Sequence, residues 1–204
     1  MDNTLDKTGH GMEHKRADKA VEFRFAKPQD IPLILRFIRE LADYEGMLDQ
    51  VVATEELLNQ WLFEKEKAEV ILGMKDGETV GFALFFHNFS TFLGRAGIYL
   101  EDLYVRPEYR GQGIGTELLR AMMDALEREG VRQVSLSVQK GNPAVRLYRR
   151  VGFRIVRETE EEYIMVDRLG RASSGKEHAH AGQAGGRGGP IQPDRGQAGR
   201  AGDL

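Results

Sequence analysis

The chain has 204 residues, a formal net charge of −3 and no cysteine, which excludes disulfides, thiolate metal sites and a cysteine nucleophile. No stretch approaches the roughly 18 consecutive apolar residues of a membrane-spanning helix, and no apolar signal segment opens the chain. We therefore expect a cytoplasmic protein without membrane contact and, from its length, a single domain with tails.

Charge and composition separate a core from two tails. Residues 1–20 are polar and carry no net charge, whereas residues 168–204 hold ten glycines and a net charge of +3. Neither segment can bury enough apolar surface to offset the entropy of ordering it, so we predict disordered tails at 1–20 and 168–204. The predicted domain, residues 21–167, is left with a charge of −6. That charge favours a cationic ligand over a nucleic acid.

The first elements of the domain are a strand and two helices. Residues 21–25 alternate in polarity like a strand. Asp30 is placed to cap a helix whose apolar stripe runs from Ile31 to Leu41. Thr54 is placed to cap a second amphipathic helix in the same way.

Three strands follow. Segments 70–72 and 80–86 flank Asp76-Gly77, a dipeptide typical of tight hairpins. Segment 98–105 is apolar on much of both faces, which is typical of a strand in the middle of a sheet.

The segment Arg110–Gly115 reads Arg-Gly-Gln-Gly-Ile-Gly and joins this strand to the next helix. Alternate glycines permit a sharp turn, and the N–H groups of a helix N-terminus attract phosphate. The segment lacks the Lys-Ser/Thr of a P-loop and the spacing of a dinucleotide-binding turn. It fits [Q/R]-x-x-G-x-[G/A] through Arg110, Gly113 and Gly115. The alternative is an ordinary glycine-rich turn.

The last elements alternate between helices and strands. A helix with an apolar face from Leu118 to Leu126 is expected to end at Gly130. A strand at 134–138, a helix at 144–151 and two final strands, 153–156 and 163–166, complete the order βααβββαβαββ.

This order, with the glycine segment after the fourth strand, resembles the GNAT acyltransferase family over residues 21–167. The resemblance implies an α/β (α+β) fold with a central mixed, mostly antiparallel sheet flanked by helices. It also implies acetyl-CoA as co-substrate, bound where the fourth and fifth strands splay apart. The fourth strand would contact the pantetheine and the loop the pyrophosphate. The implied cofactor-binding residues are Leu103, Tyr104, Val105, Arg110, Gly111, Gln112, Gly113, Ile114, Gly115, Thr116 and Asn142.

A second family element, N-x-x-A-x-x-L-Y, is matched by Ala144, Leu147 and Tyr148. Its asparagine is one place late, at Asn142, and Gly141 takes the usual position. The resemblance implies that Tyr148 is a catalytic acid, which protonates the departing CoA thiolate. A half-buried packing residue is the alternative.

The pairs Tyr44-Glu45 and Glu101-Asp102 resemble those of the diamine (spermidine/spermine and thialysine) acetyltransferase branch. There the pairs line a cationic-substrate site, which implies that all four residues bind a small polyamine or lysine-like amine. Because neighbouring strand residues face opposite sides, only Glu101 or Asp102 reaches the cleft unless the strand has a bulge, as this family has. Solvated strand-end charges are the alternative, and Phe92 is a candidate aromatic neighbour.

The chemistry expected is direct attack by the amine in a ternary complex, because a Ser-His-Asp arrangement and a cysteine are both missing from the sequence. Glu101, or a water that it holds, would accept the ammonium proton. His87 is an alternative base or simply a polar strand end. Arg146, Arg149 and Arg150 either meet the adenosine phosphate or form a solvated helix face.

The sequence thus predicts an acetyl-CoA-dependent N-acetyltransferase, with a protein or peptide acetyltransferase and a non-catalytic CoA-binding module as alternatives. We expect no metal ion and no nucleic-acid partner, and the resemblance to the family implies a homodimer.

Overall fold

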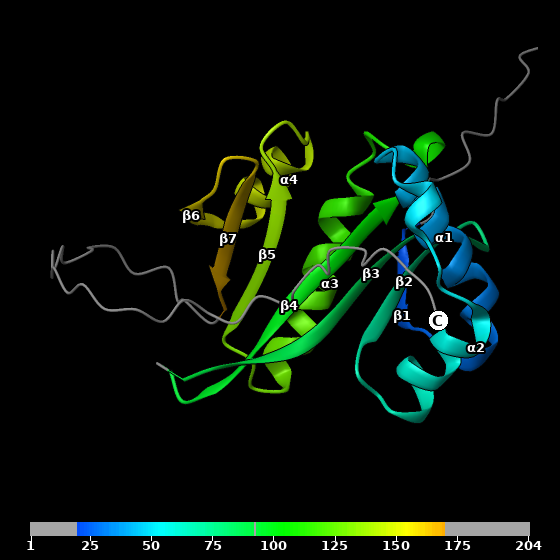
Figure 1. Cartoon of the computed structure of the whole chain (residues 1–204), viewed down its shortest axis with the longest axis horizontal. Helices are drawn as coiled ribbons and strands as arrows, with labels where there is room; N and C mark the ends of the chain where they lie inside the picture. Colours follow the sequence, from blue (N-terminus) through cyan, green and yellow to red (C-terminus); the bar gives the residue numbers. More distant parts are fainter. Residues whose placement is uncertain (1–19, 92, 170–204) are drawn as a thin grey trace, which may run out of the picture.

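A computed structural model of the chain describes residues 20–91 and 93–169. In these residues one sheet of seven strands has the order β1-β2-β3-β4-β5-β7-β6, with helices on both faces (Figure 1). The strands are β1 (Glu22–Phe25), β2 (Glu69–Lys75), β3 (Glu78–Ser90), β4 (Arg95–Val105), β5 (Gln133–Gln139), β6 (Arg154–Glu158) and β7 (Glu162–Arg168). The predicted tails lie almost wholly outside the described residues.

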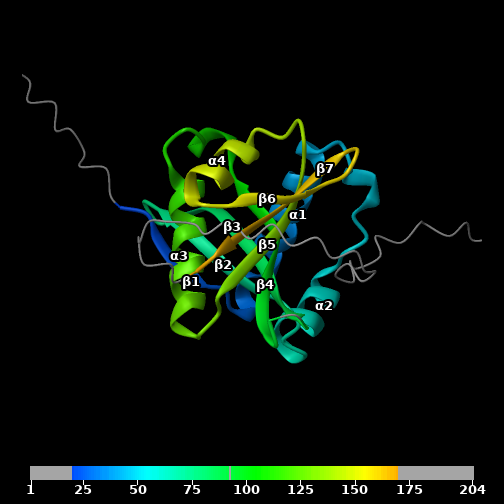
Figure 2. The ribbon, with the colours of Figure 1, turned by 90° about the vertical axis from the view of Figure 1, so that its left-hand side faces the viewer.

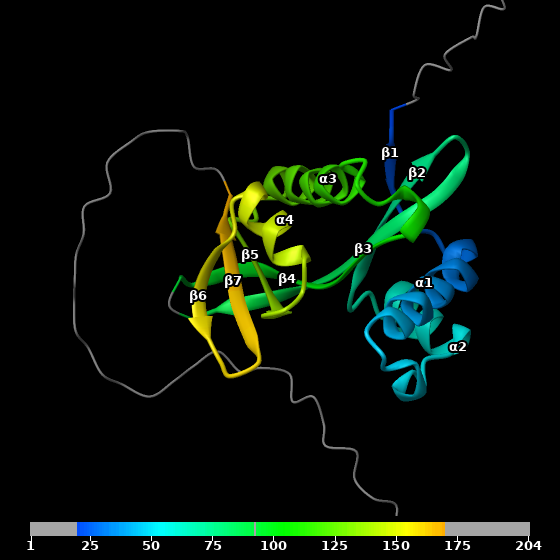
Figure 3. The same cartoon turned by 90° about the horizontal axis from the view of Figure 1, so that it is seen from above.

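The helices form one layer on each side of the sheet, as Figures 2 and 3 show. Side chains of α3 and α4 pack on one face of the sheet, and those of α1 and α2 pack on the other. The helices are α1 (Ile31–Tyr44), α2 (Glu55–Leu58, continued by a π-helical turn to Glu64), α3 (Ile114–Arg128) and α4 (Ala144–Val151). The predicted order βααβββαβαββ is confirmed. No helix in the described residues is long and apolar enough to cross a membrane.

The helix ends follow the sequence with one exception. The Thr54 hydroxyl accepts the Leu57 N–H (3.2 Å) and caps α2, and Gly130 follows α3 with a φ of +88°. Asp30 is the N-cap residue of α1, as predicted, but the expected capping bond from its side chain is not formed. Its carboxylate turns back to accept the Lys27 N–H (2.7 Å) and two guanidinium bonds from Arg24 (2.7 and 2.9 Å). An ion pair with a neighbouring strand has displaced the local capping bond.

The neighbours in the sheet are antiparallel except for β4 and β5, so the sheet is mixed and mostly antiparallel, as predicted. Within the described residues the parallel pair is held only at Ile98↔Val134 and Tyr99↔Ser135. Beyond Tyr99 the two strands diverge toward their carboxyl ends (Figure 1). A gap therefore opens in the middle of the sheet, along the edge of β4 that faces β5.

A β-bulge in β4 lies at the start of this gap. Leu84 of β3 pairs with Asp102 and Phe85 pairs with Leu100, so Glu101 is an extra residue on β4. Before the bulge, Leu100 packs into the cluster formed by α3 and α4; beyond it, Leu103 packs there, three positions later instead of two. The bulge therefore resets the alternation of side chains, and it allows Glu101 and Asp102 to face the same cleft.

Candidate active site

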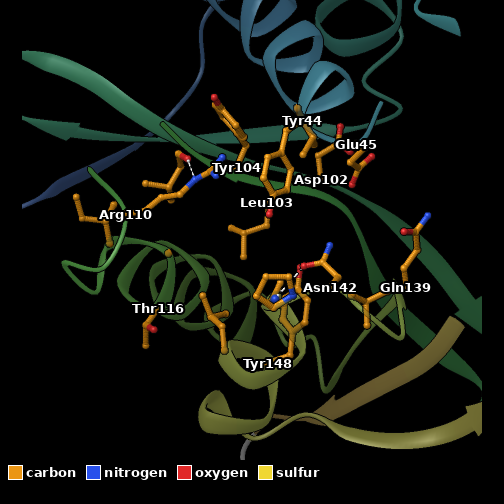
Figure 4. Close-up of a pocket in the computed structure, with 18 of the residues that line it drawn as sticks. Tyr44, Glu45, Asp102, Leu103, Tyr104, Arg110, Thr116, Gln139, Asn142 and Tyr148 are labelled. Carbon is orange, nitrogen blue, oxygen red and sulfur yellow. Dashed lines mark hydrogen bonds between the residues drawn. The ribbon is translucent and has the colours of Figure 1, made fainter. Parts of the chain in front are cut away.

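A cleft of about 400 Å³ occupies the gap between β4 and β5. It is lined by β4, β5, the loop before α3, the ends of α1 and β7, and α4. Figure 4 shows Tyr44, Glu45 and Asp102 on one side of this cleft, with Asn142 and Tyr148 opposite. The cleft thus brings together segments that are far apart in the sequence.

The glycine loop forms one end of the cleft. Gly111 and Gly113 have left-handed φ values of +77° and +85°, and Gly113 is the N-cap of α3. Open space surrounds the positions that their Cβ atoms would take. The first N–H groups of a helix lack partners one turn back, so the loop presents N–H donors at the positive end of the α3 dipole. The Thr116 N–H already donates to the Gly113 carbonyl (2.9 Å). This arrangement suits a phosphate.

The loop residues differ in where they point. Gly111, Gly113, Ile114, Gly115 and Thr116 line the cleft. Gln112 is not part of the lining, and its side chain accepts a hydrogen bond from the Lys75 Nζ (2.8 Å) on β2.

Arg110 connects the loop to the opposite wall. Its Nε donates to the Val105 carbonyl (2.8 Å), and its guanidinium lies 4.5 Å from the centre of the Tyr44 ring and 5.5 Å from that of Tyr104. Cation–π contacts of this kind are favourable. Arg110 is therefore already engaged by β4 and α1, and its placement fits a residue that positions the loop.

The β4 wall consists of Leu103, Tyr104 and Val105, all of which line the cleft. Their edge faces the strand from which β4 has separated, and the Val105 carbonyl is already used by the Arg110 Nε. The Tyr104 hydroxyl donates to the Glu40 carboxylate (3.0 Å). Burial and this acidic partner raise the pKa of Tyr104 to about 12, so its phenol stays protonated and anchors β4 to α1.

The start of α4 faces the β4 wall. The Ala144 N–H donates to the Asn142 Oδ1 (2.9 Å), so Asn142 holds the turn that leads into this short helix, whose N-cap residue is Pro143, and lines the cleft at the same time. Its side-chain oxygen is used in this turn, which leaves its amide nitrogen as the group to offer a ligand.

Tyr148 lies deeper on α4 and is 8% exposed. Its ring packs on that of Phe153, with 5.7 Å between ring centres. Burial, and then the negative charges of Asp102 and Glu45, raise the pKa of Tyr148 above its ordinary value. The phenol therefore stays protonated at neutral pH, so it is able to donate a hydrogen bond within the cleft.

The other end of the cleft is acidic. Glu45, Glu101 and Asp102 line it together with Tyr44, whose side chain is 54% exposed. Glu45 is the C-cap of α1, where the helix places it beside Tyr44, and the bulge adds Glu101 to Asp102. Four carboxylates and two arginines, Arg110 and Arg150, line the whole cleft within the described residues.

Most of the remaining side chains that the sequence suggested as site residues lie outside the cleft. His87 is exposed at the far end of β3, with its Nε2 3.4 Å from the Glu69 carboxylate, and does not line the cleft. Arg146 and Arg149 are exposed and do not line it either, whereas Arg150 does. Phe92 lies outside the described residues.

Several lining residues did not stand out in the sequence. They come from the far rim of the gap or from helix ends: Met47, Tyr109, Ser137, Val138, Gln139, Pro143 and Glu162. The alternation Val134-Ser135-Leu136-Ser137-Val138 does carry a sign of Ser137, because it places two hydroxyls on one face of β5. No local pattern indicated Glu162.

Comparison with known proteins agrees with this architecture. The acetyltransferase (GNAT) family model matches residues 35–153. The chain is 41% identical over 151 residues to the thialysine N-epsilon-acetyltransferase of Sus scrofa, covering 69% of this chain and 88% of the relative. It is 27% identical over 198 residues to an L-ornithine N5-acetyltransferase of Arabidopsis thaliana, covering 74% of this chain and 84% of the relative.

Solved structures show the same fold. The Salmonella typhimurium protein yncA, solved with acetyl-CoA, has a TM-score of 0.62 at 20% identity and covers 76% of this chain and 98% of its own. The PaiA N-acetyltransferase of Thermoplasma acidophilum, in complex with coenzyme A, has a TM-score of 0.56 at 20% identity and covers 74% of this chain and 100% of its own.

Proposed function

The chain belongs to the acetyltransferase (GNAT) family and is an acetyl-CoA-dependent N-acetyltransferase, and we propose that its acceptor is a small cationic amine. The observation that carries this proposal is the convergence of Glu45, Glu101 and Asp102 on the cleft that also holds the Tyr148 hydroxyl. Relatives named for thialysine and ornithine, both small cationic amines, support it.

The cofactor half of the cleft fits acetyl-CoA. The N–H groups of the loop from Gly111 to Thr116 would hold the pyrophosphate, and the open edge of β4 at Leu103–Val105 would pair with the pantetheine. Asn142 would add its amide nitrogen from the opposite side. When bound there, acetyl-CoA supplies the thioester carbon that the amine attacks.

The acidic half of the cleft binds the acceptor amine and removes its proton. An alkyl ammonium has a pKa of about 10.4 and must lose a proton before it can attack. Glu101, or a water that it holds, accepts that proton, while Tyr44, Glu45 and Asp102 hold the acceptor. Both reactants are then oriented in one ternary complex, and such orientation removes roughly 7–11 kcal/mol from a barrier.

Tyr148 acts on the leaving group. As the new carbon–nitrogen bond forms and the carbon–sulfur bond breaks, its hydroxyl donates to the sulfur, on which negative charge develops. A thiol has a pKa of about 8.5, below that of a phenol, so full proton transfer is uphill. Hydrogen-bond donation is therefore the larger part of the role that we assign to Tyr148. The attacking nitrogen releases its remaining extra proton as the amide forms, and this proton balances the one that the thiolate takes up to become the free thiol.

The test is an acceptor panel with saturating acetyl-CoA, followed through release of free thiol. The panel holds polyamines, thialysine, ornithine, lysine analogues and N-terminal peptides. We expect turnover with small cationic amines. Turnover confined to peptides would replace the small amine by a protein substrate, and thiol release with none of them would overturn the proposal.

We also propose that the protein is a cytoplasmic homodimer, which the family resemblance and the cysteine-free sequence support. Light scattering on the purified full chain measures the mass directly. A monomeric mass across the micromolar range would contradict the dimer.

A further inference from the structure

The end of α1 brings Tyr44 and Glu45 to the cleft on a segment with little anchorage in the core. Residues 38–61 all belong to the described part of the chain, and none of them is buried, whereas Phe37 before them and Leu62 after them belong to the core. Segments with few buried apolar contacts open more readily than the core does. The place of Tyr44 and Glu45 therefore depends strongly on the polar and aromatic contacts that the end of α1 makes.

Arg110 supplies such a contact from the glycine loop. Its guanidinium lies 4.5 Å from the centre of the Tyr44 ring and 5.5 Å from that of the Tyr104 ring (Figure 4). The Tyr104 hydroxyl donates to the carboxylate of Glu40 (3.0 Å), one turn before Tyr44 on α1. Arg110 and Tyr104 together hold the last turn of α1 against β4 and the loop.

The place of Arg110 depends in turn on the glycine loop. Its backbone N–H donates to the Pro107 carbonyl (3.2 Å), and its Nε donates to the Val105 carbonyl (2.8 Å). The next residue, Gly111, has a left-handed φ of +77° and open space around the position of a Cβ atom. Glycine has more conformational freedom to lose than any other residue. A ligand that binds the N–H groups of this loop therefore also fixes the residue that precedes them.

We infer that Arg110 is a positioning residue for the acceptor: through the ring of Tyr44 it holds the end of α1 in place, and it does so most firmly when the cofactor occupies the loop. Arg110 then acts on the acceptor without binding it, in addition to positioning the loop. Coupling between two sites is reciprocal, so a fixed end of α1 also favours the ordered loop. This inference rests on the proposed function.

The experiment uses four variants of the full chain. Arg110→Gln removes the guanidinium, and Tyr44→Leu removes the ring on which it packs. Tyr44→Phe keeps that ring and with it the cation–π contact. Arg120→Gln is the control, because it removes one positive charge from an exposed position on α3 outside the cleft lining.

Amide hydrogen exchange with and without saturating CoA tests the link without any acceptor. In the parent, CoA should slow exchange at residues 41–47 by about threefold to tenfold. Tyr44→Phe and Arg120→Gln should behave like the parent, whereas CoA should leave exchange at these residues unchanged in Arg110→Gln and Tyr44→Leu. No slowing in the parent, or equal slowing in all variants, would overturn the inference.

Kinetics with thialysine at saturating acetyl-CoA measure the effect on the acceptor. Arg110→Gln should raise the KM for thialysine by about threefold to tenfold and keep kcat within twofold, because the reacting groups are retained. The double variant Arg110→Gln/Tyr44→Leu should have the KM of Tyr44→Leu alone, because Arg110 acts through that ring. Losses that multiply in the double variant would show that Arg110 acts independently of Tyr44.

The two measurements separate this inference from the proposed function. If no amine in the panel releases thiol, the proposed function fails, and the exchange experiment alone decides whether Arg110 links the loop to α1. If amines turn over but CoA slows exchange in Arg110→Gln as much as in the parent, the proposed function stands and the role of Arg110 is overturned.

Discussion

The two halves of the cleft are made of different parts of the chain. The half that we assign to acetyl-CoA consists mainly of backbone: the N–H groups before α3 and the edge of β4. The half that we assign to the acceptor consists of side chains, namely Tyr44 and the carboxylates of Glu45, Glu101 and Asp102. Backbone recognition needs glycine and strand geometry, whereas recognition by carboxylates needs charge. Substitutions should therefore affect one half without the other, except at Tyr148, which lies where the halves meet, and at Arg110, which connects them.

The largest effect is expected from Tyr148→Phe. Loss of the hydroxyl should lower kcat by about 100-fold and leave acetyl-CoA affinity unchanged, because the ring that packs on Phe153 is kept. Steady-state kinetics and calorimetry with CoA measure the two quantities. Because the pKa of Tyr148 is raised, the parent should show no loss of rate from this phenol between pH 8 and 10. An unchanged kcat would remove Tyr148 from the mechanism.

Glu101→Gln tests the acceptor half alone. We expect kcat to fall by roughly 10- to 100-fold, because the ammonium loses its proton acceptor, with no change in CoA affinity. The activity lost should return in part at high pH, where more of the amine is already neutral. Glu127→Gln, at the far end of α3, is the control. A full rate at neutral pH would assign the base to another group.

Gly113→Ala and Gly130→Ala form a matched pair for the cofactor half. The two glycines have φ values of +85° and +88° at opposite ends of α3, with nothing within 4 Å of the added Cβ. Each variant should lose about 1–2 kcal/mol of stability. Only Gly113→Ala should weaken CoA binding, by about tenfold, as the loop N–H groups reorient. Equal CoA affinities would show that the loop does not bind the phosphates.

Asp30→Asn should affect neither half. The guanidinium of Arg24 and the Lys27 N–H hold the pKa of Asp30 below its ordinary value, so its charge stabilises the fold. We expect a loss of about 1–2 kcal/mol at pH 7, measured by denaturant unfolding, with kinetic constants within twofold of the parent.

The stability difference between the parent and Asp30→Asn should depend on pH in a definite direction. A depressed pKa contributes stability above the unfolded value of about 3.9, and the contribution is lost as the pH falls through the folded value. The difference between parent and Asp30→Asn should therefore shrink below about pH 4. Asp124→Asn, an exposed residue on α3, is the control, and a difference independent of pH would contradict the ion-pair account.

The sequence by itself determined what depends on neighbours along the chain. Apolar periodicity predicted the strands and helices in their order, and the segment Arg110–Gly115 indicated the turn before α3 because left-handed turns need glycine. The matches around Tyr148 and the pair Tyr44-Glu45 indicated cleft residues because their relative positions are fixed within single helices.

The tertiary structure alone decided how separate segments meet. The bulge at Glu101 appears only in the pairing of β4 with β3, and it turns two adjacent carboxylates toward one cleft. The Asp30 carboxylate binds Arg24 instead of forming the predicted capping bond, and the Arg110 guanidinium packs on the rings of Tyr44 and Tyr104. Glu162 joined the cleft through strand register and a hydrogen bond from Ser137. Each of these contacts joins separate elements, so its energy depends on geometry that no local pattern contains.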